Sequence, residues 1–133
     1  MFSVYLSVRH SSSEPAVVTE AIGLVPDESR TAGRPYGPTG APSRSSAWVR
    51  HVGPKDAVAR VEDAICEIHK SWGPAVAAGL NGLRRHGWTA QLVIVQRIEG
   101  EDDYMSKGIS LCRESIEWLA QAGASIDIDQ YVL

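Results

Sequence analysis

Two aspartates and a tyrosine alternate near the end of the chain and are the residues best suited to chemistry. Asp127, Asp129 and Tyr131 occupy every second position, so in a strand they share one face, with the Cβ atoms of the two aspartates roughly 7 Å apart. Such a pair acts as acid and base when its surroundings separate the two pKa values, or offers two oxygen ligands to a divalent cation. No third ligand and no nucleophile joins them by motif, so we predict no catalytic residue and no metal site.

The first strand adds polar side chains of the same kind. Residues 2–9 alternate apolar and polar side chains, a pattern typical of a half-buried strand, and this points Tyr5 and Arg9 outward. Either Trp48 or Arg50 is expected to join them from a strand at 47–52. The candidate surface for a ligand or partner is therefore made of Tyr5, Arg9, Trp48, Arg50, Asp127, Asp129 and Tyr131.

Three interpretations of this surface stay open. It is a solvated sheet face with cross-strand ion pairs, each contributing up to ~1 kcal/mol, a surface for a ligand or partner, or a catalytic site. Trp48 begins a strand beside a polar loop, where a tryptophan suits a partner anchor.

Other motifs argue against the common enzyme classes and cofactors. The four histidines stand singly, without the spacing of a zinc site. Neither a Gly-x-Ser-x-Gly segment nor a nucleotide-binding glycine motif is present, so we predict no cofactor. Cys66 and Cys112 fit neither a zinc ribbon nor a Cys-x-x-Cys motif. We predict that both are reduced thiols buried in helices.

The elements that position these residues are predicted from periodicity and from glycine and proline. After the first strand, Ser13 is the expected N-cap of a short helix that ends at Gly23. Residues 26–46 are rich in Pro, Gly and Ser and predict a long surface loop, with a short edge strand at about 28–34. The inward residues of the short helix are expected to be Val17, Val18, Ala21 and Ile22.

A helix in two parts follows the strand at 47–52. Asp56 is its expected cap, Gly73-Pro74 interrupts it, and Gly87 ends it. The first part carries an apolar stripe of Val58, Val61, Ile65, Ile68 and Trp72, and the second one of Val76, Leu80 and Leu83.

The last third of the chain predicts strand, helix and strand. Residues 88–98 are apolar on both faces in their middle, which favours a strand inside the sheet. An acidic turn at 99–103 leads to a helix capped by Ser106, with a core stripe of Ile109, Cys112, Ile116 and Leu119. The final strand is expected near the middle of the sheet, with its apolar side chains in the core: Ile126, Ile128 and Val132.

The order of these elements is strand, helix, short strand, strand, two helices, strand, helix, strand. It predicts a single α+β domain over 1–133. The expected architecture is a two-layer sandwich, ferredoxin-like in general character, with a mostly antiparallel sheet of four to five strands and helices packed on one face.

Composition and charge argue against several partners. The net charge is −3, with ten Arg and three Lys, which leaves no electrostatic footprint for nucleic acid or an acidic membrane. The N-terminus lacks the features of a signal peptide, and the longest apolar run, 92–95, is too short to cross a bilayer. We expect a soluble, cytoplasmic protein that binds neither nucleic acid nor membranes.

Several segments, taken in order, carry a resemblance to a known family. They are the helix exit Glu20-Ala-Ile-Gly-Leu24-x-Pro26, the loop with Gly33, the strand start Ser45-Ser-Ala-Trp48, the helix break at Pro74, and the ending from Ala122 to Tyr131. Together they resemble the bacterial family called domain of unknown function 4279. The resemblance implies a small α+β protein of bacterial type and supplies no catalytic residue.

Two functional hypotheses remain. The first is a non-catalytic, protein-binding module, such as an immunity-type protein or an assembly subunit, that uses the outer sheet face and the loop 26–46. The alternative is a small-ligand binder or enzyme with a pocket between that loop and the polar sheet face. A homodimer through the same face also stays open.

Overall fold

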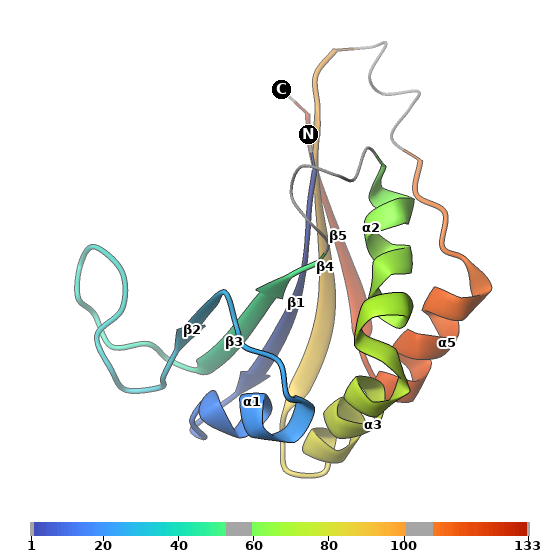
Figure 1. Ribbon diagram of the computed structural model, residues 1–133. Coiled ribbons are helices and arrows are strands. Elements are labelled where there is room, and N and C mark those ends of the chain that lie inside the picture. The colour runs from blue at the N-terminus through green and yellow to red at the C-terminus, as the bar shows by residue number, and fades with distance from the viewer. Residues whose placement is uncertain (1, 53–59, 101–107, 133) are drawn as a thin grey trace.

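The fold consists of a five-stranded sheet with helices packed on one of its faces (Figure 1). The computed structural model describes residues 2–52, 60–100 and 108–132. The strands are β1 (Phe2–His10), β2 (Glu28–Arg30), β3 (Ser46–His51), β4 (Thr89–Ile98) and β5 (Ser125–Val132). Their order across the sheet is β2-β3-β1-β4-β5, antiparallel throughout except for the parallel pair β4–β5. The predicted α+β class and the mostly antiparallel sheet are therefore confirmed.

The helical layer follows the predicted order. It contains α1 (Ala16–Ile22), α2 (Val61–Glu67), the π-helical turn η1 (Ile68–Trp72), α3 (Gly73–Arg84) and α5 (Arg113–Ala122). The predicted interruption at Gly73-Pro74 is present as η1, where the helix widens before α3 begins. The predicted cap Asp56 and stripe residue Val58, the predicted cap Ser106, and most of the acidic turn at 99–103 lie outside the described residues. No helix in the described part of the chain is both long enough and apolar enough to cross a membrane.

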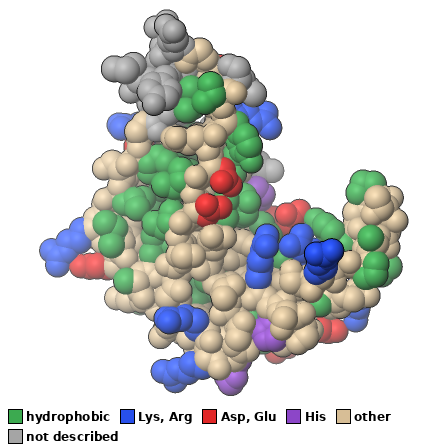
Figure 2. All heavy atoms as spheres, turned by 180° about the vertical axis from the view of Figure 1, so that it is seen from behind, with side chains coloured by type: hydrophobic (Ala, Val, Ile, Leu, Met, Phe, Trp, Pro, Cys, Tyr) green, Lys and Arg blue, Asp and Glu red, His purple; other side chains and the backbone are tan. Residues whose placement is uncertain are grey.

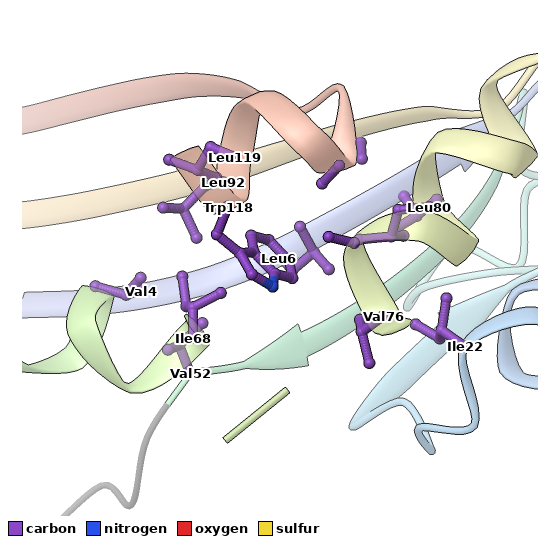
Figure 3. Packing of buried hydrophobic residues seen from close by; sticks show 14 of the residues in the cluster. Val4, Leu6, Ile22, Val52, Ile68, Val76, Leu80, Leu92, Trp118 and Leu119 are labelled. Carbon is purple, nitrogen blue, oxygen red and sulfur yellow. The ribbon is translucent and has the colours of Figure 1, made fainter. Parts of the chain in front are cut away.

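The core fills the space between the sheet and these helices (Figure 3). Alternate residues of β1 and β4, such as Leu6 and Leu92, face the helices and are fully buried. Ile65, Ile68 and Leu80 meet them from the helical side, as their three- and four-residue spacing predicted.

The final strand does not lie in the middle of the sheet, which corrects the prediction. β5 is an edge strand, and Ile126 and Ile128 remain 37% and 46% exposed. Both side chains do share the helix-facing side with their register partners Leu92 and Ile94, but α5 packs mainly against α3, and they stay partly exposed. Val132, also predicted for the core, is 73% exposed. Alternation assigned the faces of this strand but not its place in the sheet.

The start of two helices also differs from the prediction. α1 begins at Ala16 and Ser13 makes no cap hydrogen bond to it, and Val17 is exposed. α5 begins only at Arg113, because Cys112 has extended backbone angles. The stripe counted from Ile109 is therefore out of phase, so Ile116 is exposed while the buried residues of α5 are Ser115, Trp118, Leu119 and Ala122.

The Pro/Gly/Ser-rich segment forms a projecting hairpin-like loop, which we call the arm (residues 31–45). It leaves the body of the protein between β2 and β3 (Figure 1). A bridge between Pro35 and Pro42 and backbone hydrogen bonds join its two sides. Arg34 pairs with Glu14 ahead of α1 at 3.1 Å, an exposed contact between the arm and the segment before α1. The predicted edge strand is present as the short β2.

Candidate functional site

The sheet face opposite the helices, here called the outer face, is built from alternate residues of all five strands. Strand register places His51, Tyr5, Val93 and Asp127 in one row across β3, β1, β4 and β5. Residues in such a row share a face, with neighbouring strands about 4.8 Å apart. Tyr5 and Asp127 are thus separated by a single strand.

A second row brings two arginines together. Arg9 of β1 and Arg30 of β2 both pair with Ala47 of β3, one from each side. Their Cα atoms are therefore about 10 Å apart on the same face, close enough for both guanidinium groups to reach one bound anion.

An open hollow of about 270 Å³ lies over this part of the outer face, and we call it the hollow. Ala47 and Val49 give it an apolar floor because β3 carries small and branched residues there. In the view of Figure 2, basic side chains gather in the recess beside the arm, and acidic side chains lie nearer the middle of the molecule. The polar residues that line the hollow are Tyr5, Ser7, Arg9, Glu28, Arg30 and His51.

The two arginines of the hollow have spare hydrogen-bonding capacity. Arg9 Nε donates a long bond of 3.4 Å to Ser7 Oγ. The guanidinium of Arg30 lies over the Tyr36 ring, 5.4 Å from its centroid, and its buried Nε has no hydrogen-bond partner among the described residues. Within the described residues no carboxylate forms an ion pair with either side chain. A planar guanidinium in this state is suited to a carboxylate or phosphate oxygen.

Tyr5 stands between the basic and acidic parts of the outer face. Partial burial raises the pKa of its hydroxyl, and the negative charges of Asp129, Asp127 and Glu28 raise it further, while Arg9 opposes them. The Tyr5 ring meets His51 edge to face, with ring centroids 5.7 Å apart. Tyrosine is protonated at neutral pH even at its ordinary pKa of about 10, and the raised pKa of Tyr5 extends this to higher pH. Its hydroxyl can therefore donate a hydrogen bond into the hollow.

Asp127 and Asp129 form the acidic part of the outer face. Both are half-buried on β5, in register with Val93 and Val95 of β4. Among the described residues, no group of three or more His, Cys, Asp or Glu side chains could hold a metal ion. We call the outer face bipolar because two arginines lie over β1–β3, with Glu28 among them, and two carboxylates lie over β5, with Arg97 of β4 on the same face in register with Tyr131.

The structure brings five of the predicted surface residues to this face: Tyr5, Arg9, Asp127, Asp129 and Tyr131. Trp48 and Arg50 were wrongly assigned, because both lie on the helix-facing side, in register with Val8 and Leu6. Trp48 is fully buried and donates from Nε1 to Thr19 Oγ1 at 3.1 Å. Arg50 donates to the carbonyl of Val25 at 2.5 Å.

Of the residues that line the hollow, the candidate surface predicted from sequence contained only Tyr5 and Arg9. Glu28 and Arg30 come from β2, and His51 from the end of β3. Part of this was predictable from the sequence, since an edge strand was expected at about 28–34, a range that includes Glu28 and Arg30. Its pairing with β3, however, depends on the arm folding back, which composition does not reveal.

The comparisons with known proteins add one finding. A family model described as domain of unknown function (DUF4279) matches residues 1–133, the whole chain. Neither the curated proteins nor the solved structures gave a match.

Proposed function

The chain belongs to the DUF4279 family, and from this starting point we propose that it is a non-catalytic binding module. The module takes a protein partner on the outer face, between the sheet and the arm. We further propose a bacterial, cytoplasmic protein whose role is that of an immunity-type protein or a subunit of a larger assembly.

The observation that carries this proposal is the pair Arg9 and Arg30 at the hollow. Arg9 is exposed and Arg30 half-buried, and neither has a carboxylate partner among the described residues. Their free hydrogen-bond donors, the buried Nε of Arg30 among them, can be satisfied by an incoming acidic side chain. The hollow is open to solvent, which suits a side chain presented by a protein surface better than an enclosed small molecule.

The acidic part of the outer face supports a partner of mixed charge. Asp127 and Asp129 lie across β4 from Tyr5, so a partner that places a carboxylate at the hollow can place a basic side chain near β5. Charge complementarity of this kind sets orientation and excludes wrong partners. The fitting partner therefore presents an acidic and a basic group on one surface.

Affinity capture with the tagged full-length protein tests the proposal. Arg9→Ser/Arg30→Ser should reduce recovery of the captured partner about tenfold or more, because charged hydrogen bonds contribute about 1.5–3 kcal/mol each. Lys70→Ser/Arg85→Ser is the matched control, since both residues are exposed in the helical part of the chain and the loss of charge is the same. Equal recovery with both double variants would contradict the proposal.

A small anionic ligand is the second candidate, and the lining of the hollow favours it. Arg9, Arg30, Tyr5 and His51 converge on one space whose volume is near the lower limit for small-molecule sites. Titration with inorganic phosphate and with succinate, followed by NMR, distinguishes the two. Saturable shifts confined to these residues would favour the small ligand, while their absence together with partner capture favours the protein partner. A concentration-dependent dimer in light scattering would instead assign the face to a second copy of this chain.

A further inference from the structure

The two cysteines, far apart in sequence, meet in the helical layer. Cys66 lies in α2, and Cys112, 46 positions later, immediately precedes α5. Their Sγ atoms are 3.3 Å apart. Both residues are half-buried rather than enclosed in the core, which corrects the prediction of two buried helical thiols and leaves the sulfurs within reach of a small reagent.

The surroundings give the two sulfurs different roles. The Ser115 hydroxyl, whose Oγ lies 3.1 Å from Cys112 Sγ, lowers the pKa of Cys112, and the neighbouring Cys66 thiol lowers it further. Donating toward Cys112 raises the pKa of Cys66, and burial adds to this. Because the thiolate is the nucleophile, Cys112 is the first to react and Cys66 is the resolving thiol.

We propose that Cys66 and Cys112 form a reversible disulfide by exchange with a low-molecular-weight disulfide such as oxidised glutathione. The Cys112 thiolate attacks one sulfur of that disulfide and releases the other as a thiolate. Cys66 then loses its proton to solvent and attacks Cys112 Sγ, which releases the second thiolate. The protein loses two electrons and two protons, and the small disulfide is reduced to two thiols.

Geometry favours this closure over reaction with a second molecule. The sulfurs must approach by only about 1 Å to reach the bond length of about 2.05 Å. The bond would join α2 to the start of α5 and enclose η1, α3 and β4 between its ends. It lies in the helical layer and does not involve the outer face, so it is independent of the proposed binding function. Transient redox disulfides of this kind also occur in the reducing cytosol.

Exchange in glutathione buffers of increasing oxidation tests the proposal on the full-length protein. After alkylation of free thiols, mass spectrometry should show both cysteines disappearing together in a monomer, with no lasting glutathione adduct. The folded protein should reach half-oxidation at an oxidised glutathione concentration about tenfold or more below that required in denaturing urea, because folding raises the effective thiol concentration. Two free thiols persisting in the folded protein, or oxidation only to a linked dimer, would overturn the proposal.

Single variants test the order of attack. Cys66→Ser should accumulate a glutathione adduct on Cys112, since no resolving thiol remains. Cys112→Ser should acquire its adduct on Cys66 several-fold more slowly, and Ser115→Ala should slow the first step in the wild-type background. Equal adduct rates for the two single variants would refute the assigned roles, and circular dichroism shows that each variant is folded.

Discussion

Trp48 belongs to the core, where its indole N–H is satisfied by Thr19 at 3.1 Å. Thr19→Val should lower the free energy of unfolding by about 1–3 kcal/mol, because a buried donor is left without an acceptor. In a Trp48→Phe background, the same change should lower the free energy of unfolding much less, because the indole N–H donor is already absent. Urea unfolding measures both, with Thr19→Ser as the control that keeps the hydroxyl. Equal costs in the two backgrounds would show that the bond does not matter.

Tyr5 provides a test of the charges on the outer face. Its pKa is raised by partial burial, by Asp129 and by the other nearby carboxylates. Asp129→Asn should lower the pKa of Tyr5, and Arg9→Ser should raise it, as followed by NMR of the tyrosine ring carbon. Because folding raises this pKa, the related stability is present below about pH 10 and is lost as pH rises through the folded-state value. A Tyr5 pKa unchanged in both variants would contradict the bipolar face.

For single residues, the sequence alone predicted the correct face of the sheet where polar and apolar residues alternate without interruption. In β5 polar and apolar residues alternate from Ser125 to Asp129, and Asp127 and Asp129 do share the outer face. In β3 each face carries apolar residues: Ala47 and Val49 lie on the outer face, and Trp48 lies on the helix-facing side. Periodicity does not choose between such sides, because either would bury apolar area, and Trp48 and Arg50 were misplaced for that reason.

Among the elements, α1 and α3 pack so closely that one position admits only glycine. A Cβ on Gly79 would lie 2.8 Å from the carbonyl oxygen of Ala21 and 3.0 Å from Ile22 Cγ2. Gly79→Ala should therefore cost about 1–3 kcal/mol of stability. Gly82, in the same helix, has nothing within 4 Å of such a Cβ, so Gly82→Ala should instead stabilise by about 0.5–1 kcal/mol. Denaturant unfolding of both variants checks this, and effects of the same sign would contradict the packing.

Because β5 is an edge strand, substitutions in β5 and in β4 should differ in their effect on stability. Ile94 and Ile128 are register partners on the same side of the sheet, yet Ile94 is fully buried and Ile128 is 46% exposed. Ile94→Ala should cost about 2–5 kcal/mol, and Ile128→Ala about 1 kcal/mol or less. Thermal and urea unfolding give both values. Similar losses would mean that β5 is covered in solution.

The elements and their order were predictable because each carries its own local signal. The helix stops at Gly23 and Gly123 are present, and both glycines have the positive φ angles, +72° and +68°, that favour glycine. The order of strands in the sheet was not predictable for β5, since it depends on which neighbour the chain meets after α5. The start of α5 was missed because an apolar period continues into the extended residues before Arg113.

In the whole molecule, the helical layer and the outer sheet face have different roles in this account. The core lies between the sheet and the helices, and the cysteine pair lies in the helical layer. The outer face and the arm are where we propose that a partner binds. The sequence indicated a polar sheet face, and it left a pocket between this face and the long loop as one of two alternatives. It did not indicate that Arg9 and Arg30 would stand on either side of Ala47, because β2 reaches β3 only through the fold of the arm.

Site-specific photo-crosslinking in the source organism tests this division most directly. A photoreactive residue would replace Thr89 or Tyr131 on the outer face, or, as controls, Ala78 or Gln121 on the exposed surface of α3 and α5. We predict a discrete adduct with another protein from the outer-face positions only, and its loss in the Arg9→Ser/Arg30→Ser background. Adducts from the helical positions alone, or outer-face adducts that survive loss of both arginines, would contradict the account.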